Sequence, residues 1–238
     1  MRWAFYAFAA LVIAGIVAVA LFPLSLALRL ADAPVEGTPS GTVWNGVIED
    51  ASANSVALGT VEVGARPWPT LIGRPAARLG IAGPQGTGTT RATVANGVTL
   101  TDIDAVVPAA PYSFAGPFGS ALTGDVTVRG DATLAMDGAC RAAALTIETD
   151  VLVRAAAQLG QTGPILTGPA TCEDGTLVAR LTGASPDADA GLLVRLRPGT
   201  YVTELTLAPT DPRAGALLRR YGFREGPGGY TLTTRGTY

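Results

Sequence analysis

The stretch that decides the fold is residues 125–129, which read DVTVR, so that apolar and polar residues alternate strictly. Residues 203–207, TELTL, repeat the pattern. A period of two is typical of a β-strand with one buried and one solvated face. Runs of similar composition, rich in Val, Thr, Leu and Ala, fill much of the chain from residue 42 onward. The sequence predicts strands at 42–48, 55–63, 77–81, 89–95, 98–103, 125–135, 143–148 and 176–181.

Tight-turn dipeptides separate several of these runs. Asn-Gly at 96–97 and Asp-Gly at 137–138 and 174–175 are typical of short hairpins, which join antiparallel neighbours. Strand and turn units recur at about ten residues, the spacing usual for an antiparallel sandwich or rolled sheet. A short C-terminal helix is expected from Asp211, as N-cap, to Tyr221, a weaker helical pattern covers 152–159, and residues 229–235 form a last strand. The predicted class is mainly β.

The N-terminal segment has no charged residue between Arg2 and Arg29. As a helix, residues 3–28 would be about 39 Å long, more than the bilayer core of about 30 Å. A cleavable signal peptide is the alternative, because residues 31–33 (ADA) resemble its cleavage site, but its apolar region normally has about 7–15 residues. The sequence therefore predicts a transmembrane anchor over residues 1–30, a linker over 31–40 and a β domain over 41–238. Arg2 favours a cytoplasmic N-terminus, which places the β domain in the periplasm of a bacterial cell.

The composition excludes several classes of function. The chain of 238 residues has no His, and its 17 basic residues are all Arg, so His-dependent nucleophiles, P-loops and Schiff-base lysines are absent. A net charge of -2 argues against nucleic acid as a partner. Two carboxylate pairs remain as candidates for acid–base chemistry or calcium binding: Asp102 with Asp104, and Asp187 with Asp189. The alternative for both pairs is that they are solvated residues on the surface. No catalytic, metal or cofactor motif emerges, so the prediction is a non-enzyme without a cofactor.

Two cysteines and a few aromatic residues are the remaining candidates. Cys140 and Cys172 are expected to form a disulfide outside the cytoplasm, with free thiols or a redox pair as alternatives. Trp44 is expected in the core, at the centre of the first strand. Trp68, between two prolines, is as readily a partner contact as a core residue. Tyr112 and Phe114, in a Pro-rich stretch, either contact a partner or cover an end of the sheet.

The order of several short motifs resembles the N protein of the type II secretion pathway. The motifs are FPLSLAL at 22–28, GTVWNG at 41–46, LGTV at 58–61, Arg-Pro at 66–67, GAC at 138–140, CEDG at 172–175 and a final Gly-x-Tyr-x-Leu at 228–232.

The resemblance implies an accessory component of the type II secretion system that is anchored in the inner membrane by one helix. It would act through contacts with other components of that system. The family also resembles AsmA-like proteins, which implies a lipid-binding or lipid-transfer groove as the alternative function. A periplasmic hydrolase is a third hypothesis. An inner face of the sheet that is left open would favour lipid binding, whereas an inner face filled by side chains would favour the other hypotheses.

Overall fold

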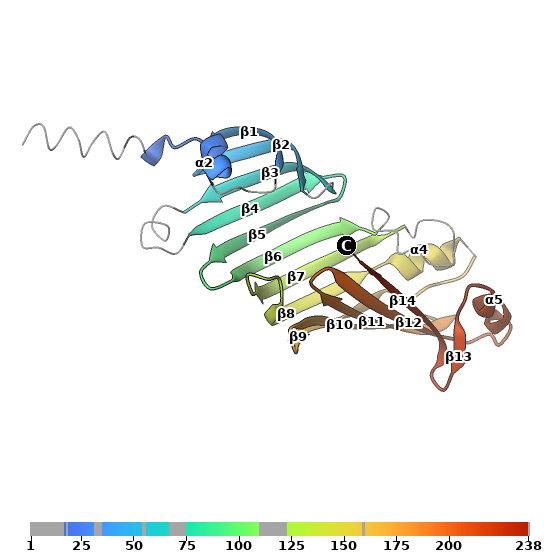
Figure 1. Ribbon diagram of the computed structural model, residues 1–238. Helices are drawn as coiled ribbons and strands as arrows, with labels where there is room; N and C mark the ends of the chain where they lie inside the picture. Colours follow the sequence, from blue (N-terminus) through green and yellow to red (C-terminus); the bar gives the residue numbers. More distant parts are fainter. Residues whose placement is uncertain are drawn as a thin grey trace, which may run out of the picture. The chain divides into compact units, whose positions relative to one another are not determined.

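The computed structural model describes residues 17, 19–30, 35–53, 56–66, 75–109, 123–158 and 160–237. The chain divides into two compact units, Met1–Gln85 and Gly86–Tyr238 (Figure 1). Strands dominate both units, and every strand pairing within a unit is antiparallel. The mainly β, antiparallel class predicted from the sequence is confirmed.

The first unit is a sheet whose strands neighbour one another in chain order. They are β1 (Glu36–Thr42), β2 (Asn45–Ala53), β3 (Val56–Ala65) and β4 (Ala76–Gly83). The short helix α2 (Leu24–Leu30) packs on this sheet. Leu24 is buried in a cluster with Ile48, Ala51 and Val61, so the apolar face of β2 and β3 is covered by the end of the N-terminal apolar run.

The structure corrects two expectations in this unit. Residues 36–40, expected in the linker, form most of β1. Trp44 lies in the turn between β1 and β2, half-buried, and not at the centre of a strand. The β domain expected over 41–238 stays a prediction, and its described strands belong to the two compact units that divide at Gln85. Pro and Gly gave residues 36–40 the composition of a linker, yet an edge strand tolerates Pro.

The second unit is a single sheet with the strand order β5 to β12, then β14, then β13. The bounds are β5 (Gly86–Val94), β6 (Val98–Pro108), β7 (Asp125–Leu134), β8 (Cys140–Thr149), β9 (Leu166–Glu173), β10 (Thr176–Ala184), β11 (Ala188–Arg197), β12 (Thr200–Pro209), β13 (Arg224–Gly226) and β14 (Gly229–Thr237). Two helices accompany it, α4 (Val151–Ala157) and α5 (Ala214–Arg220). Its buried core contains Leu145, Leu166 and Leu181.

The helices differ from the sequence expectation in extent. The C-terminal helix begins at Ala214 and not directly after Asp211, although Asp211 accepts a hydrogen bond from the backbone N–H of Arg213 (2.9 Å), as an N-cap residue does. The weaker pattern at 152–159 corresponds to α4, so the domain has more than the one short helix that was predicted.

The predicted transmembrane anchor falls largely on residues 1–16 and 18, which lie outside the described residues. Within the part of the chain that the structure describes, no helix combines the length and the hydropathy needed to span a bilayer. Residues 24–30 of the predicted anchor form α2, whose Leu24 is buried against β2 and β3, so this helix belongs to the first unit.

Candidate functional site: an apolar cavity and an open sheet edge

An apolar cavity of about 380 Å³ lies in the second unit. Strands β7 to β12 and β14 all contribute to its wall, and α4 adds Val151 and Leu152. Strands β7 and β14 are separated in the sheet by several others. Because both nevertheless line one cavity, the sheet of this unit curls around it. A rolled sheet, and not a two-sheet sandwich, is therefore what this unit forms.

The strict alternation along the strands builds the wall. Aliphatic side chains dominate it, at every second position of a strand: Val126 and Val128; Leu145 and Ile147; Leu177, Ala179 and Leu181; Leu192, Val194 and Leu196. The lining residues with polar side chains are Thr149, Tyr201, Thr203 and Thr234, each of which carries a hydroxyl group. No charged side chain lines the cavity among the described residues.

Burial is uneven along the wall. Leu145, Leu166, Ala179 and Leu181 are buried, and Leu166 is only 1% exposed. Other lining side chains, including those of Leu177, Leu192, Val194 and Leu205, are only partly buried. The cavity is therefore a concave apolar surface with a packed floor and an incompletely covered inner face. The side chains of the wall therefore leave part of the inner face uncovered.

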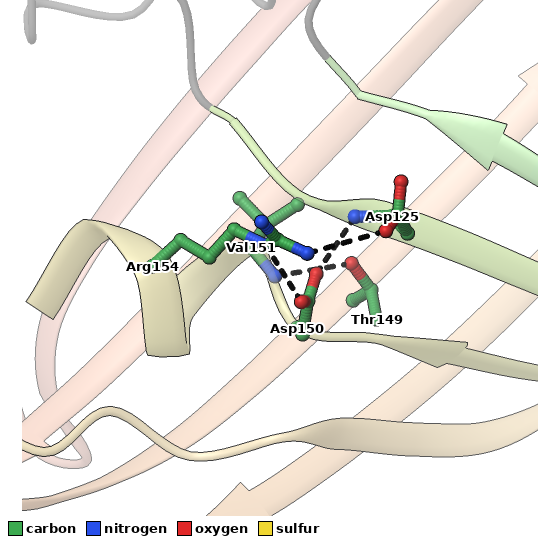
Figure 2. A network of polar contacts seen from close by, with 5 residues as sticks. All are labelled: Asp125, Thr149, Asp150, Val151 and Arg154. Atoms are coloured by element: carbon green, nitrogen blue, oxygen red, sulfur yellow. Dashed lines mark hydrogen bonds and ion pairs between the residues drawn. The ribbon is translucent and has the colours of Figure 1, made fainter. Parts of the chain in front are cut away.

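A polar network fixes α4 beside the cavity (Figure 2). Asp150, just before the helix, accepts a hydrogen bond from the backbone N–H of Asp125 in β7 (2.7 Å). The Arg154 guanidinium donates to Asp150 (2.8 Å) and forms an ion pair with Asp125 (3.3 Å). The backbone N–H of Val151 donates to the hydroxyl of Thr149 (3.4 Å). The start of α4, which carries the lining residues Val151 and Leu152, is thus tied to β7 and β8.

The same contacts control the charge of Asp150. Partial burial acts to raise its pKa, but the hydrogen bond from Asp125 and the hydrogen bond and charge of Arg154 outweigh burial, so the pKa lies below its ordinary value. Asp150 is therefore ionised wherever the protein is near neutral pH. The network acts as a fixed structural clamp and not as a proton donor.

A disulfide joins Cys140 to Cys172, with 5.5 Å between their Cα atoms. The ladder between β8 and β9 runs only from Leu145 paired with Ala170 to Thr149 paired with Leu166. The cysteines lie beyond this ladder, at the start of β8 and near the end of β9. Next to them, the backbone N–H of Cys140 donates to the carbonyl of Gly175 (3.0 Å). The disulfide therefore closes the end of the sheet where β8 and β9 separate.

The carboxylate pairs identified in the sequence do not gather into a site. Asp102 pairs with Arg91, and Asp104 with Arg129 (3.3 Å), all on an exposed face of the sheet. Asp187 is exposed and accepts a hydrogen bond from the backbone of Thr162 (2.7 Å), and Asp189 is exposed on β11. Among the residues described, no three His, Cys, Asp or Glu side chains are grouped so as to hold a metal ion.

The aromatic candidates for partner contact are not placed by the structure. Trp68, Tyr112 and Phe114 lie outside the described residues. Trp44 is described, and its indole N–H donates to the carbonyl of Val19 (2.8 Å). Its role in the first unit is to connect the β1–β2 turn with the N-terminal segment.

Strand β14 has an open edge. Its partner β13 covers only Gly229–Thr231. The residues that flank a two-residue hairpin turn exchange both hydrogen bonds, and Gly226 and Gly229 flank such a turn. Counting alternate residues from Gly229, the N–H and C=O groups of Thr233, Arg235 and Thr237 point away from β12. Past Thr231, no strand of the described chain pairs on that side.

The hairpin between β11 and β12 independently shows which residues of β14 direct their backbone groups toward β12. Arg197 and Thr200 flank the two-residue turn between β11 and β12, so alternate residues of β12 from Tyr201 bond toward β14. Their partners in β14 are Tyr230, Leu232, Thr234 and Gly236. The intervening residues of β14 are therefore those whose backbone groups are directed to the open edge. Sequence reasoning missed this edge because it depends on the length of β13.

Residues 36–233 match the family of type II secretion system (T2SS) protein N. The chain belongs to this family. The matched region begins with β1 and ends within β14, so it covers the described strands of both units. No curated protein and no solved structure shows significant similarity to the chain. Membership makes the protein an accessory component of the type II secretion system, as the resemblance of its motifs implied.

Proposed function

We propose that the protein is a non-catalytic component of the type II secretion system that binds other components in the periplasm through the open edge of β14. The proposed β domain is held at the inner membrane by a single N-terminal helix. The observation that carries the binding role is the row of outward-directed backbone groups at Thr233, Arg235 and Thr237. An unpaired strand edge is a ready template for a strand from another chain.

The N-terminal segment supports membrane attachment. Its described residues expose large apolar side chains, with Leu21 66% and Leu30 73% exposed. Exposed apolar clusters on a protein surface are typical of contacts with membranes or other proteins. Since α2 belongs to the first unit, residues 3–21 are the part left to cross the membrane, and as a helix they would span about 28 Å, close to the bilayer core of about 30 Å.

The junction after this segment is fixed by several polar contacts. Trp44 donates to the carbonyl of Val19 (2.8 Å), and the backbone N–H of Val43 donates to Phe22 (3.0 Å). Pro23 forms an isolated bridge with Thr42. Trp is favoured at membrane interfaces because its ring is apolar and its N–H is polar. Trp44 is therefore suited to the outer boundary of the proposed anchor.

The edge hypothesis is tested by placing a photo-crosslinking amino acid at Arg235 in intact cells. The matched control position is Arg195, which is also exposed but lies on the internal strand β11. We expect crosslinks to an identified secretion-system component from position 235 and none from position 195. Crosslinks from both positions, or from neither, would show that partners do not dock along this edge.

A backbone substitution tests the same contact without a probe. Thr233→Pro removes the outward N–H, whereas Thr233→Ala changes the exposed side chain and keeps the N–H. Proline is tolerated at a free edge, so both variants should accumulate normally. Loss of one intermolecular hydrogen bond of about 1 kcal/mol corresponds to about a fivefold weaker contact. We expect secretion to fall with Thr233→Pro alone, and equal secretion by the two variants would contradict the proposal.

A further inference from the structure

The cavity of the second unit leaves many apolar side chains incompletely covered. Side chains normally pack at crystal-like density and leave few voids larger than a water molecule. The volume of about 380 Å³ corresponds to about a dozen water molecules at roughly 30 Å³ each. Ordered water needs two to four polar partners, and this wall offers only scattered hydroxyl groups. We propose that the cavity binds one acyl chain of a membrane phospholipid.

The size of the cavity fits a single chain. A methylene group takes about the same space as a water molecule, so the cavity accommodates roughly a dozen methylene groups. Ligand sites of small molecules have volumes of about 300–1,000 Å³, which places this cavity near their lower end. A folded partner or an α-helix, about 10–12 Å across with its side chains, would need more room.

The chemistry of the wall selects an aliphatic occupant. A peptide would bring backbone N–H and C=O groups, and burying each of these without a partner is unfavourable. The hydroxyls of Thr149, Tyr201, Thr203 and Thr234 are too few to pair with an extended peptide backbone. An acyl chain has no N–H or C=O groups along its length that need hydrogen-bond partners. No cation lines the described cavity to recognise the carboxylate of a free fatty acid, which favours a lipid whose headgroup stays outside.

The source of the chain is the bilayer to which the protein is attached. This step rests on the proposed N-terminal anchor, whereas the cavity itself does not depend on the secretion partners. Burial of each methylene group contributes to binding in proportion to the apolar surface removed from water. The strands that line the cavity therefore bind lipid by the same alternation that forms the fold.

The test uses the full-length protein in its own membrane. Cells are grown with a palmitate analogue that carries a diazirine near its methyl end, so that the probe is incorporated into phospholipids. After irradiation the protein is purified and its adducts are mapped by mass spectrometry. We expect adducts with the mass of an intact phospholipid on peptides from β11 and β12, around Val194 and Leu205. Adducts on the N-terminal peptides report the anchor separately.

Two substitutions on one strand separate occupancy from folding. Val194→Trp fills part of the cavity, whereas Leu193→Trp adds the same ring at the neighbouring position, which does not line it. We expect Val194→Trp to lower the cavity adducts about tenfold, equivalent to about 1.4 kcal/mol. Leu193→Trp should leave them unchanged, and in both variants the disulfide should form and the N-terminal adducts should persist.

Three results would overturn the proposal. The first is N-terminal adducts without cavity adducts, which would leave the anchor intact and the cavity without lipid. The second is a yield of cavity adducts that Val194→Trp does not reduce. The third is cavity adducts that carry only the mass of the free fatty acid. Absence of N-terminal adducts together with strong cavity adducts would contradict the anchor and not the cavity.

Discussion

Removing the disulfide between Cys140 and Cys172 should destabilise the second unit by a predictable amount. The two residues are 32 positions apart. On the loop-entropy model, a crosslink of this span restricts the unfolded chain by roughly 12 cal/mol/K, or about 3.7 kcal/mol at 25 °C. Replacement of both residues by Ala, which introduces no buried hydroxyl, should lower the free energy of unfolding of this unit by that amount.

Hydrogen exchange followed by mass spectrometry measures this decrease in the free energy of unfolding in the full-length chain. Amides that exchange only on global unfolding of the second unit, expected in β10 and β11, should exchange about 500-fold faster, since each tenfold change corresponds to about 1.4 kcal/mol. Amides in β2 and β3 of the first unit are the internal control and should keep their exchange rates.

The single variants Cys140→Ala and Cys172→Ala sharpen the test. Either one breaks the same crosslink, so each should cost nearly as much as the double variant. Additive single effects would refute the crosslink explanation. A loss below about 1 kcal/mol would also refute it, because the stabilisation would then not come from restriction of the unfolded chain.

Other predictions concern single contacts. Because the pKa of Asp150 is lowered in the folded protein, its contribution to stability is complete above the pKa of the unfolded chain, about 3.9, and is lost as pH falls through the folded pKa. Acidification should therefore speed hydrogen exchange in α4. The Asp150→Asn variant should not show this acceleration. Gly215→Ala would place a Cβ 2.0 Å from the Tyr230 hydroxyl and should lower the free energy of unfolding by roughly 1–3 kcal/mol. Adding Tyr230→Phe should restore part of this loss. Replacing any one Asp of the two candidate pairs by Asn should change the free energy of unfolding by less than about 0.5 kcal/mol and leave secretion intact. These residues are Asp102, Asp104, Asp187 and Asp189.

The sequence predicts the strands whose pattern is local. Residues 125–129 and 203–207 alternate strictly and lie in β7 and β12. The Asp-Gly dipeptide at 174–175 forms the expected turn, with Asp174 at φ 47° and Gly175 at φ 76°, both in the left-handed region that a tight hairpin requires. In such stretches, side-chain pattern and turn chemistry agree with the final fold.

Strands with weak local patterns were missed. β9 reads LTGPATCE and β11 begins ADAG, so Gly, Pro and Asp conceal their strand character. β1 reads EGTPSGT, and the composition of its residues 36–40 predicts a linker, yet the strand pairs with β2 along most of its length. These strands are stabilised by neighbours on the sheet, and such pairing can override weak intrinsic preference. The cavity was unpredictable for the same reason, because curvature of a sheet is a property of many strands together.

The two proposals meet on β14 and can still be separated there. Leu232 and Thr234 direct their side chains to the cavity, whereas the side chains of Thr233 and Arg235 are exposed. The backbone groups of Thr233 and Arg235 point to the open edge, in the plane of the sheet. A change of Thr233 therefore perturbs the edge without altering the cavity wall, and a larger side chain at Leu232 fills the cavity without removing an edge N–H. If Thr233→Pro reduced the lipid adducts as strongly as Val194→Trp does, the edge and the cavity would form one binding site and not two.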